Sequence, residues 1–109
     1  MVRGVCMNIW RLKPLLNGKT KMIGYVMVGT NNLEKAITFY DEILQVINLR
    51  RKDTDEFCAG YTQNDSDGTI EFYVTKPANG KTATFGNGTQ VSFNVSSRAM
   101  VDKFHEIGL

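Results

Sequence analysis

The sequence has few of the residues that build metal sites or disulfide frameworks. Its 109 residues include one histidine and two cysteines, Cys6 and Cys58, which lie 52 positions apart without CxxC spacing. This pattern gives no sign of a zinc knuckle or a CxxC redox pair, so we expect two reduced thiols. No stretch approaches the ~18 apolar residues of a membrane span, and polar side chains interrupt the first twenty residues too often for a secretory signal. We therefore expect a cytoplasmic protein.

Acidic residues are missing from the start of the chain, because five Lys or Arg and no Asp or Glu precede Glu34. The whole chain has 13 Lys and Arg against 11 Asp and Glu, a net charge of +2, which is far from the basicity of a dedicated nucleic-acid binder. We expect neither a nucleic-acid nor a membrane partner. Residues 1–21 are interpreted as an irregular basic leader, and the run Arg50-Arg51-Lys52 as a solvated strand end whose field is cancelled by the acids that follow.

Hydrophobic periodicity in the remaining chain predicts an α+β fold. A helix over Leu33–Leu44 is predicted from apolar residues at helical spacing, with Asn31 as its N-cap and Glu34 completing a signal like a capping box. A second helix is predicted over Arg98–Ile107, capped by Ser96 or Ser97. The predicted strands are 23–29, 46–52, 56–63, 69–75 and 90–95, and a connector rich in Gly and Pro covers 76–89.

Alternation along these strands divides their side chains between two faces. One face is apolar and is expected to pack against the helices: Val26, Val28, Ile70, Phe72, Val74, Val91, Phe93 and Val95. The other face is mixed and polar: Tyr25, Met27, Glu71, Tyr73, Thr75, Gln90, Ser92 and Asn94. This second composition suits the lining of a concave pocket, although exposure of a polar sheet face to solvent explains the same pattern.

Several spaced segments resemble a known superfamily. They are the stretch YVMVGTNNLEKAITFY at residues 25–40, TKP at 75–77, GNGT at 86–89 and SRAMVDKFH at 97–105. Together these segments resemble the glyoxalase, bleomycin-resistance and extradiol-dioxygenase superfamily, the vicinal oxygen chelate fold. The resemblance covers residues 22–109 and leaves the leader unmatched.

The resemblance implies βαβββ modules of the vicinal oxygen chelate type, with the second module incomplete. Residues 22–109 would be a C-terminally shortened glyoxalase-like domain, with the first module at 22–77, a linker at 78–89 and the start of a second module at 90–109. Relatives complete their cup with three more strands. Without those strands the last predicted strand and helix would expose apolar surface and open edges, so we expect a homodimer whose chains pool their modules, with a swap of the last strand and helix as one way to do so.

In metal-dependent relatives, His, Gln and Glu side chains of the first and last strands of each module hold a divalent ion. The positions that correspond in this sequence are Tyr25, Glu71 and Gln90, and the fourth would lie on a strand that this chain lacks. Only Glu71 and Gln90 offer oxygen ligands suited to a hard cation. No functional metal centre is therefore expected within a single chain, and no cofactor beyond an optional divalent metal. His105, the single histidine, is interpreted as a surface or rim residue.

Three functional hypotheses remain from the sequence. The first is a small-molecule binding protein of the bleomycin-resistance kind, which holds a planar or aromatic compound against Tyr25, Tyr73 and Phe85. Its expected ligand-binding residues are Tyr25, Met27, Glu71, Tyr73, Gln90, Ser92 and Asn94. The second is a glyoxalase-like lyase or dioxygenase with Glu71 and Gln90 as metal ligands and a site completed by the partner chain. The third is a fold remnant without present activity. No catalytic residue is assigned and no ligand is identified.

Overall fold

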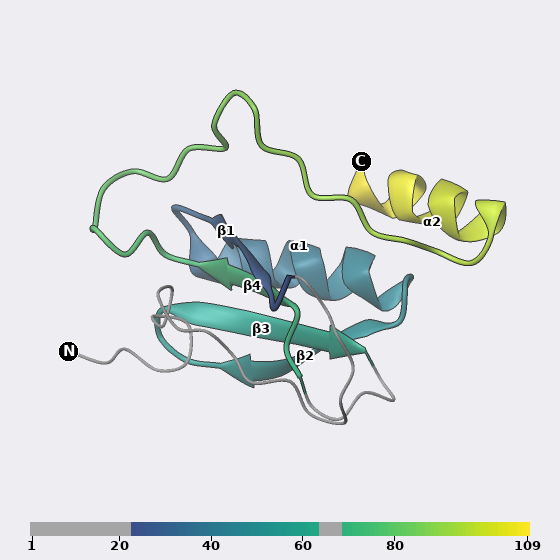
Figure 1. Ribbon diagram of the computed structural model, residues 1–109, viewed down its shortest axis with the longest axis horizontal. Helices are drawn as coiled ribbons and strands as arrows, with labels where there is room; N and C mark the ends of the chain where they lie inside the picture. The colour runs from purple at the N-terminus through teal and green to yellow at the C-terminus, as the bar shows by residue number, and fades with distance from the viewer. Residues whose placement is uncertain (1–22, 64–68) are drawn as a thin grey trace.

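The computed structural model describes residues 23–63 and 69–109, and it has two layers, a mixed sheet with both described helices on one side (Figure 1). The elements are β1 (Val26–Gly29), α1 (Leu33–Gln45), β2 (Leu49–Thr54), β3 (Cys58–Gln63), β4 (Phe72–Thr75) and α2 (Arg98–Gly108). The strands lie in the order β1-β4-β3-β2. β1 runs parallel to β4, and the other two pairings are antiparallel. This arrangement confirms the predicted α+β class with one βαβββ module and an incomplete second one. The leader and the 64–68 turn lie outside the described residues.

The N-cap of helix α1 lies one residue later in the chain than predicted. The side chain of Asn32, not of Asn31, accepts a hydrogen bond from the backbone N–H of Lys35, at 3.0 Å. Asn32 has extended backbone angles and lies three residues before Lys35, which is the spacing that an N-cap requires. Asn31 instead exchanges two hydrogen bonds with the backbone of Ala83, so it ties the linker to the start of the helix.

The strand after α1 begins at Leu49 rather than at Val46. The N–H groups of Val46, Ile47 and Asn48 donate back to carbonyl groups of the last helical turn, at 3.1 to 3.3 Å. Asn48 then takes a positive φ of 65°, a conformation that Asn tolerates and that ends the helical turn. The chain is therefore still completing the helix where the β-branched residues predicted a strand.

The sheet buries a different set of side chains on each face. On the helix side, one cluster joins α1 and α2 to alternate residues of the strands; Leu44, Ala59 and Val74 are fully buried in it. A smaller cluster on the opposite face consists of Cys58, Ile70 and Tyr73, with Tyr25 and Met27 packed against it. The predicted apolar face is thus confirmed at Val26, Val28, Phe72, Val74, Val91, Phe93 and Val95, which all belong to the helix side.

Ile70 lies on the opposite face from the one predicted. Phe72 is the register partner of Tyr61, yet the N–H of Glu71 also donates to the Tyr61 carbonyl, at 3.2 Å. Two consecutive residues therefore face one residue of β3, as in a β-bulge, and the alternation changes phase before Phe72. Ile70 consequently joins Tyr73 instead of Val74.

Residues 90–95 do not form the predicted strand. They run as an extended segment without strand pairing, between the arching linker and α2 (Figure 1). Val91, Phe93 and Val95 still pack on the helix-side cluster, so the alternation predicted which side chains face the core. Their backbone has no strand beside it in the described part of the chain, and a strand requires such a partner for its N–H and C=O groups. Helix α2 has no buried residue.

The expectation of a reduced thiol at Cys58 is wrong. Cys58 is disulfide-bonded, and it is 2% exposed. Cys6 lies outside the described residues. Within the described ranges, no helix is both long enough and apolar enough to cross a membrane.

Candidate functional site

The sheet face without helices gathers three of the side chains predicted to bind a ligand. Tyr25 and Tyr73 meet edge to face, with ring centroids 5.1 Å apart, and Met27 packs on the same cluster. Tyr73 is buried, whereas Tyr25 and Met27 are half-buried. Edge-to-face packing is a favourable arrangement of two aromatic rings, and these three side chains form the aromatic wall of this sheet face. Both described helices pack on the other face of the sheet, so neither contributes to this wall.

A glycine shapes the centre of this face. The strand register places Met27, Tyr73, Gly60 and Asp53 in one row across all four strands. A Cβ atom at Gly60 would lie 2.9 Å from two carbon atoms of Ile70 and 2.9 Å from the Tyr73 ring. The absence of a side chain at Gly60 therefore lets Ile70 and Tyr73 lie over β3, as close approach in a strand demands.

Asp53 is a residue of this face that the sequence analysis missed. The register of β2 shifts between Arg51 and Asp53, so Arg51 pairs with Tyr61 on the helix side and Asp53 pairs with Gly60 on the helix-free side. Burial is the main cause that raises the pKa of the Tyr73 phenol, and the negative charge of Asp53 adds to it, followed by Tyr25. Tyr73 is consequently a neutral hydroxyl near neutral pH. The alternation of polar and apolar residues does not indicate this register shift in β2, so the sequence alone did not assign Asp53 to a face of the sheet.

Glu71, the predicted carboxylate of the site, precedes β4 and is half-buried. Its N–H donates to the Tyr61 carbonyl, and its carbonyl accepts from the Val26 N–H at 3.0 Å. The backbone of Glu71 is thus fixed between β3 and β1.

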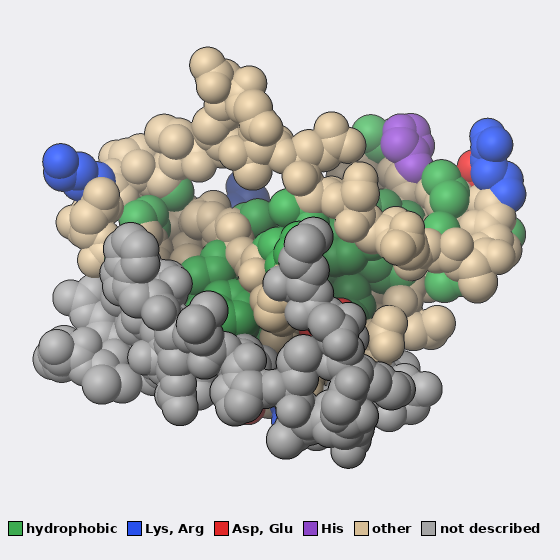
Figure 2. All heavy atoms as spheres, in the orientation of Figure 1, with side chains coloured by type: hydrophobic (Ala, Val, Ile, Leu, Met, Phe, Trp, Pro, Cys, Tyr) green, Lys and Arg blue, Asp and Glu red, His purple; other side chains and the backbone are tan. Residues whose placement is uncertain are grey.

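The other predicted site residues are not brought to this face within one chain. Gln90, Ser92 and Asn94 are exposed, and their apolar neighbours pack on the helix-side cluster. Phe85 is 91% exposed on the linker and belongs to neither cluster. His105 is exposed on α2, where it appears in purple in Figure 2. Of the predicted ligand-binding residues, the described structure therefore brings Tyr25, Met27 and Tyr73 together on this face.

The donor set for a metal is incomplete in the single chain. Among the described residues, no group of three or more His, Cys, Asp or Glu side chains is placed to hold a metal ion. Glu71 and Gln90 supply one carboxylate and one amide; Glu71 precedes β4 within the sheet, and Gln90 is exposed at the start of the segment whose apolar residues pack on the helix-side cluster. These two residues alone do not fit a divalent metal centre.

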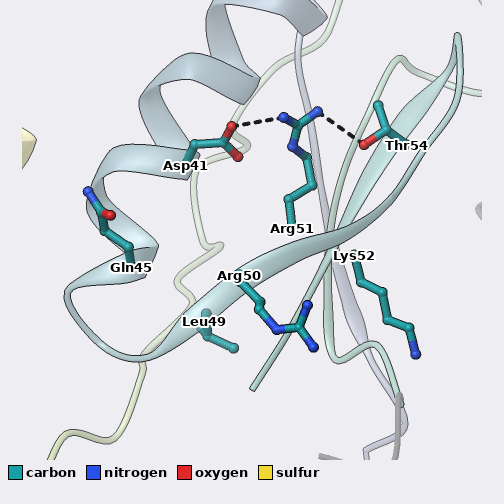
Figure 3. A pocket seen from close by; sticks show the side chains of 7 residues that line it. All are labelled: Asp41, Gln45, Leu49, Arg50, Arg51, Lys52 and Thr54. Atoms are coloured by element: carbon teal, nitrogen blue, oxygen red, sulfur yellow. Dashed lines mark hydrogen bonds and ion pairs between the residues drawn. The ribbon is translucent and has the colours of Figure 1, made fainter. Parts of the chain in front are cut away.

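A separate open cleft of about 410 Å³ lies between α1 and β2, which is the last strand of the described sheet. Figure 3 shows Arg51 pointing from β2 towards Asp41 on α1, whereas Arg50 and Lys52 point the other way from the strand. The Arg51 guanidinium is 3.2 Å from the Asp41 carboxylate and donates to the Thr54 hydroxyl at 3.1 Å. Asp41 also accepts a hydrogen bond from the Tyr61 hydroxyl at 2.9 Å. Burial, with this bond and the charge of Asp41, raises the pKa of Tyr61.

Comparison with solved structures decides the family. The crystal structure of a glyoxalase/bleomycin resistance protein from Albidiferax ferrireducens T118 matches with a TM-score of 0.71 and 34% sequence identity, over 81% of this chain and 70% of that one. This chain belongs to the glyoxalase/bleomycin resistance protein family. The predicted resemblance to the vicinal oxygen chelate superfamily is therefore confirmed. No family model and no curated protein matches the chain.

Proposed function

We propose that this member of the glyoxalase/bleomycin resistance family is a small-molecule binding protein without a functional metal site in the single chain. The observation that carries the proposal is the edge-to-face pair of Tyr25 and Tyr73 on the sheet face that neither described helix covers. Ligand pockets are usually lined by hydrophobic and aromatic side chains with a few polar groups among them. Met27 extends the wall, and the carboxylates of Glu71 and Asp53 are candidate hydrogen-bond acceptors at its border.

The rest of the pocket is proposed to come from a second copy of the chain. Gln90, Ser92 and Asn94 are exposed on a segment without strand pairing, and α2 buries none of its residues. Val101 and Leu109 on this helix are 47% and 93% exposed. A homodimer would give the segment a neighbouring strand and bring its polar residues to the partner's aromatic wall. Light scattering at micromolar concentration should give about twice 12.2 kDa, and a monomeric mass would contradict this assembly.

Ligand binding can be tested with bleomycin and a panel of neutral flat aromatic compounds, followed by thermal unfolding and calorimetry. Tyr25→Ala removes half of the aromatic pair, and stacked rings contribute about 1 kcal/mol, so affinity should fall roughly fivefold to tenfold. Phe85→Ala is the matched control, because it removes an aromatic ring that is 91% exposed on the linker. Equal effects of the two variants, or no binding by the parent across the panel, would overturn the proposal.

The second candidate function is a divalent-metal-dependent lyase or dioxygenase whose site is completed by the partner chain. The observation that favours it is the fixed backbone of Glu71 between β1 and β3, which suits a ligand position. Glu71 and, from the partner, Gln90 would be the metal ligands. Metal analysis of the purified protein and thermal unfolding with nickel, zinc, manganese and iron test this candidate. A metal-induced rise in melting temperature that Glu71→Gln abolishes would support it, and no rise with any metal would exclude it.

We also propose a cytoplasmic location, which rests on the absence of a recognisable signal in the sequence. The disulfide at Cys58 points the other way, because disulfides are rare in cytosolic proteins. Cell fractionation, combined with thiol counting under denaturing conditions, distinguishes a cytoplasmic location from an oxidising compartment. A free Cys58 thiol in the cytosolic fraction supports the proposed location.

A further inference from the structure

Two Asn-Gly pairs lie in the described linker between β4 and α2, Asn79-Gly80 and Asn87-Gly88. A third pair, Asn17-Gly18, lies outside the described residues. In an Asn-Gly pair the side-chain amide carbon is close in the chain to a backbone nitrogen, and the glycine has no Cβ atom to obstruct their approach. All four residues of the two linker pairs are exposed to solvent. Exposure therefore does not distinguish the two pairs, whereas their hydrogen bonds do.

Hydrogen bonds hold the Asn79-Gly80 pair in a turn. The Gly80 N–H donates to the Pro77 carbonyl at 3.1 Å, and the side-chain oxygen of Asn79 accepts from the Lys81 N–H at 2.9 Å. Gly80 has a positive φ of 72°, a conformation that turns commonly assign to glycine. The nitrogen of Gly80 and the amide of Asn79 are thus both engaged with other partners.

The Asn87-Gly88 pair has no such contacts. In the described part of the chain, neither the Asn87 side chain nor the Gly88 N–H has a hydrogen-bond partner. A Cβ atom at Gly88 would meet nothing within 4 Å, so the space around this residue is open. Glycines on both sides of Asn87 add backbone freedom. The Gly88 nitrogen and the Asn87 amide carbon can therefore approach each other without the loss of a hydrogen bond.

We propose that Asn87 is a spontaneous modification site, which deamidates through a cyclic imide while Asn79 is protected by its turn. The Gly88 nitrogen attacks the Cγ carbon of Asn87 and forms a new C–N bond. The side-chain nitrogen leaves with the Gly88 proton as ammonia. Water then opens the imide at either carbonyl group, its hydroxyl going to the carbon and its proton to the nitrogen. The products are aspartate and isoaspartate, and no oxidant or reductant is needed.

The products change the linker shortly before the extended segment 90–95. Each product adds one negative charge three residues before Gln90, and isoaspartate also lengthens the main chain by one carbon. The apolar residues of this segment pack on the helix-side cluster, whereas Asn87 belongs to neither buried cluster. Modification therefore alters the connection between the sheet and α2. The proposal stands independently of ligand binding at the aromatic wall.

Incubation of the purified full chain at mildly alkaline pH, followed by tryptic peptide mapping with tandem mass spectrometry, tests the proposal. Cleavage after Lys81 places Asn79 and Asn87 on different peptides. Conversion of Asn87 should be at least about tenfold faster than that of Asn79, because two hydrogen bonds must break before the second pair can react. The same incubation in concentrated urea removes the turn, so the two rates should come within about twofold of each other. Equal rates in the folded chain, or no conversion of Asn87, would overturn the proposal.

Gly88→Ala is the matched variant. Its added Cβ atom has open space in the folded chain and Gly88 does not have a positive φ, so the fold should tolerate it. The methyl group shields the backbone nitrogen, and conversion of Asn87 should be largely lost while the slow conversion of Asn79 is unchanged. Asn87→Gln is a second variant, in which the longer side chain disfavours closure of the ring. Undiminished conversion at position 87 in either variant would contradict attack by the Gly88 nitrogen.

Discussion

Residues 23–75 and residues 76–109 have similar hydrophobic patterning but very different burial. In the first region α1 buries Leu33, Ile43 and Leu44 against the sheet. In the second region α2 is equally amphipathic in sequence, yet it buries nothing completely and reaches the core through partly exposed side chains. Figure 2 shows hydrophobic side chains gathered below the linker, whereas the purple His105 of α2 lies at the margin of the molecule.

The difference shows that an amphipathic helix becomes part of a core only when a sheet is available to cover its apolar side. The four strands of the first region supply that surface for α1. The second region has one extended segment, 90–95, and no strand beside it in the described chain. The predictions below compare the two regions directly.

The largest difference is expected between Leu44→Ala and Ile107→Ala. Leu44 is fully buried, so its truncation leaves a cavity and should lower the free energy of unfolding by about 2–5 kcal/mol. Ile107 on α2 is only partly buried, and its truncation should cost less than about 1 kcal/mol. Urea denaturation of the two variants measures both values. Similar losses at the two positions would mean that α2 is as fully packed in solution as α1.

A smaller, pH-dependent effect is expected at Tyr61 in the first region. Tyr61→Phe removes the hydrogen bond to Asp41 and should lower stability at pH 8 by about 1 kcal/mol. The pKa of Tyr61 is raised in the folded state, so above about pH 10 the unfolded chain loses this proton while the native one keeps it, and stability falls as pH rises. Denaturation between pH 8 and 11 should therefore show a flatter decline for Tyr61→Phe than for the parent. Parallel curves would contradict this coupling.

The two N-caps should respond differently to the same substitution. Asn32→Ala removes the side-chain cap of α1 and should lower global stability by about 1 kcal/mol, because α1 carries the core. Ser97→Ala removes the cap of α2, and its effect should be confined to faster amide exchange in that helix. Hydrogen exchange and urea denaturation of both variants distinguish local from global loss. A global loss of similar size for Ser97→Ala would place α2 within the same cooperative unit.

The smallest effect is expected where the two regions are tied together. Asn31→Ala removes both hydrogen bonds to the Ala83 backbone, and these bonds lie at the exposed surface. Global stability should change by less than about 0.5 kcal/mol, while the Ala83 amide should exchange faster with solvent. Unchanged exchange at Ala83 would show that other contacts hold the linker.

The sequence predicted the bounds of the two helices better than it predicted their cap residues and the start of the strand after α1. Helix α1 was placed within one residue of its end, and α2 likewise, because the 3.6-residue period of apolar side chains is a local signal. The N-cap of α1 was predicted at Asn31, one residue too early, because the two adjacent asparagines have the same side chain. The start of β2 was missed because the turns through Asn48 depend on hydrogen bonds back to α1.

The sequence predicted the sheet face of three candidate site residues. Tyr25, Met27 and Tyr73 share a face because alternation and register agree there. Ile70 and Asp53 were misplaced or missed because each lies next to a register shift, at Glu71 and after Arg51. A single extra residue in a strand exchanges the two faces, and the sequence carries no local mark of it.

The sequence by itself determined the α+β class, the two helices, the apolar face of the sheet and the family resemblance. These features depend on short-range periods and on motifs that neighbouring residues specify. Tertiary structure alone decided that 90–95 pairs with no described strand, that Cys58 is disulfide-bonded, and that Arg51 and Thr54 meet beside Asp41. Strand pairing, bulges and the contacts between α1 and β2 join residues far apart in the chain, so their free energy depends on the whole fold rather than on any local pattern.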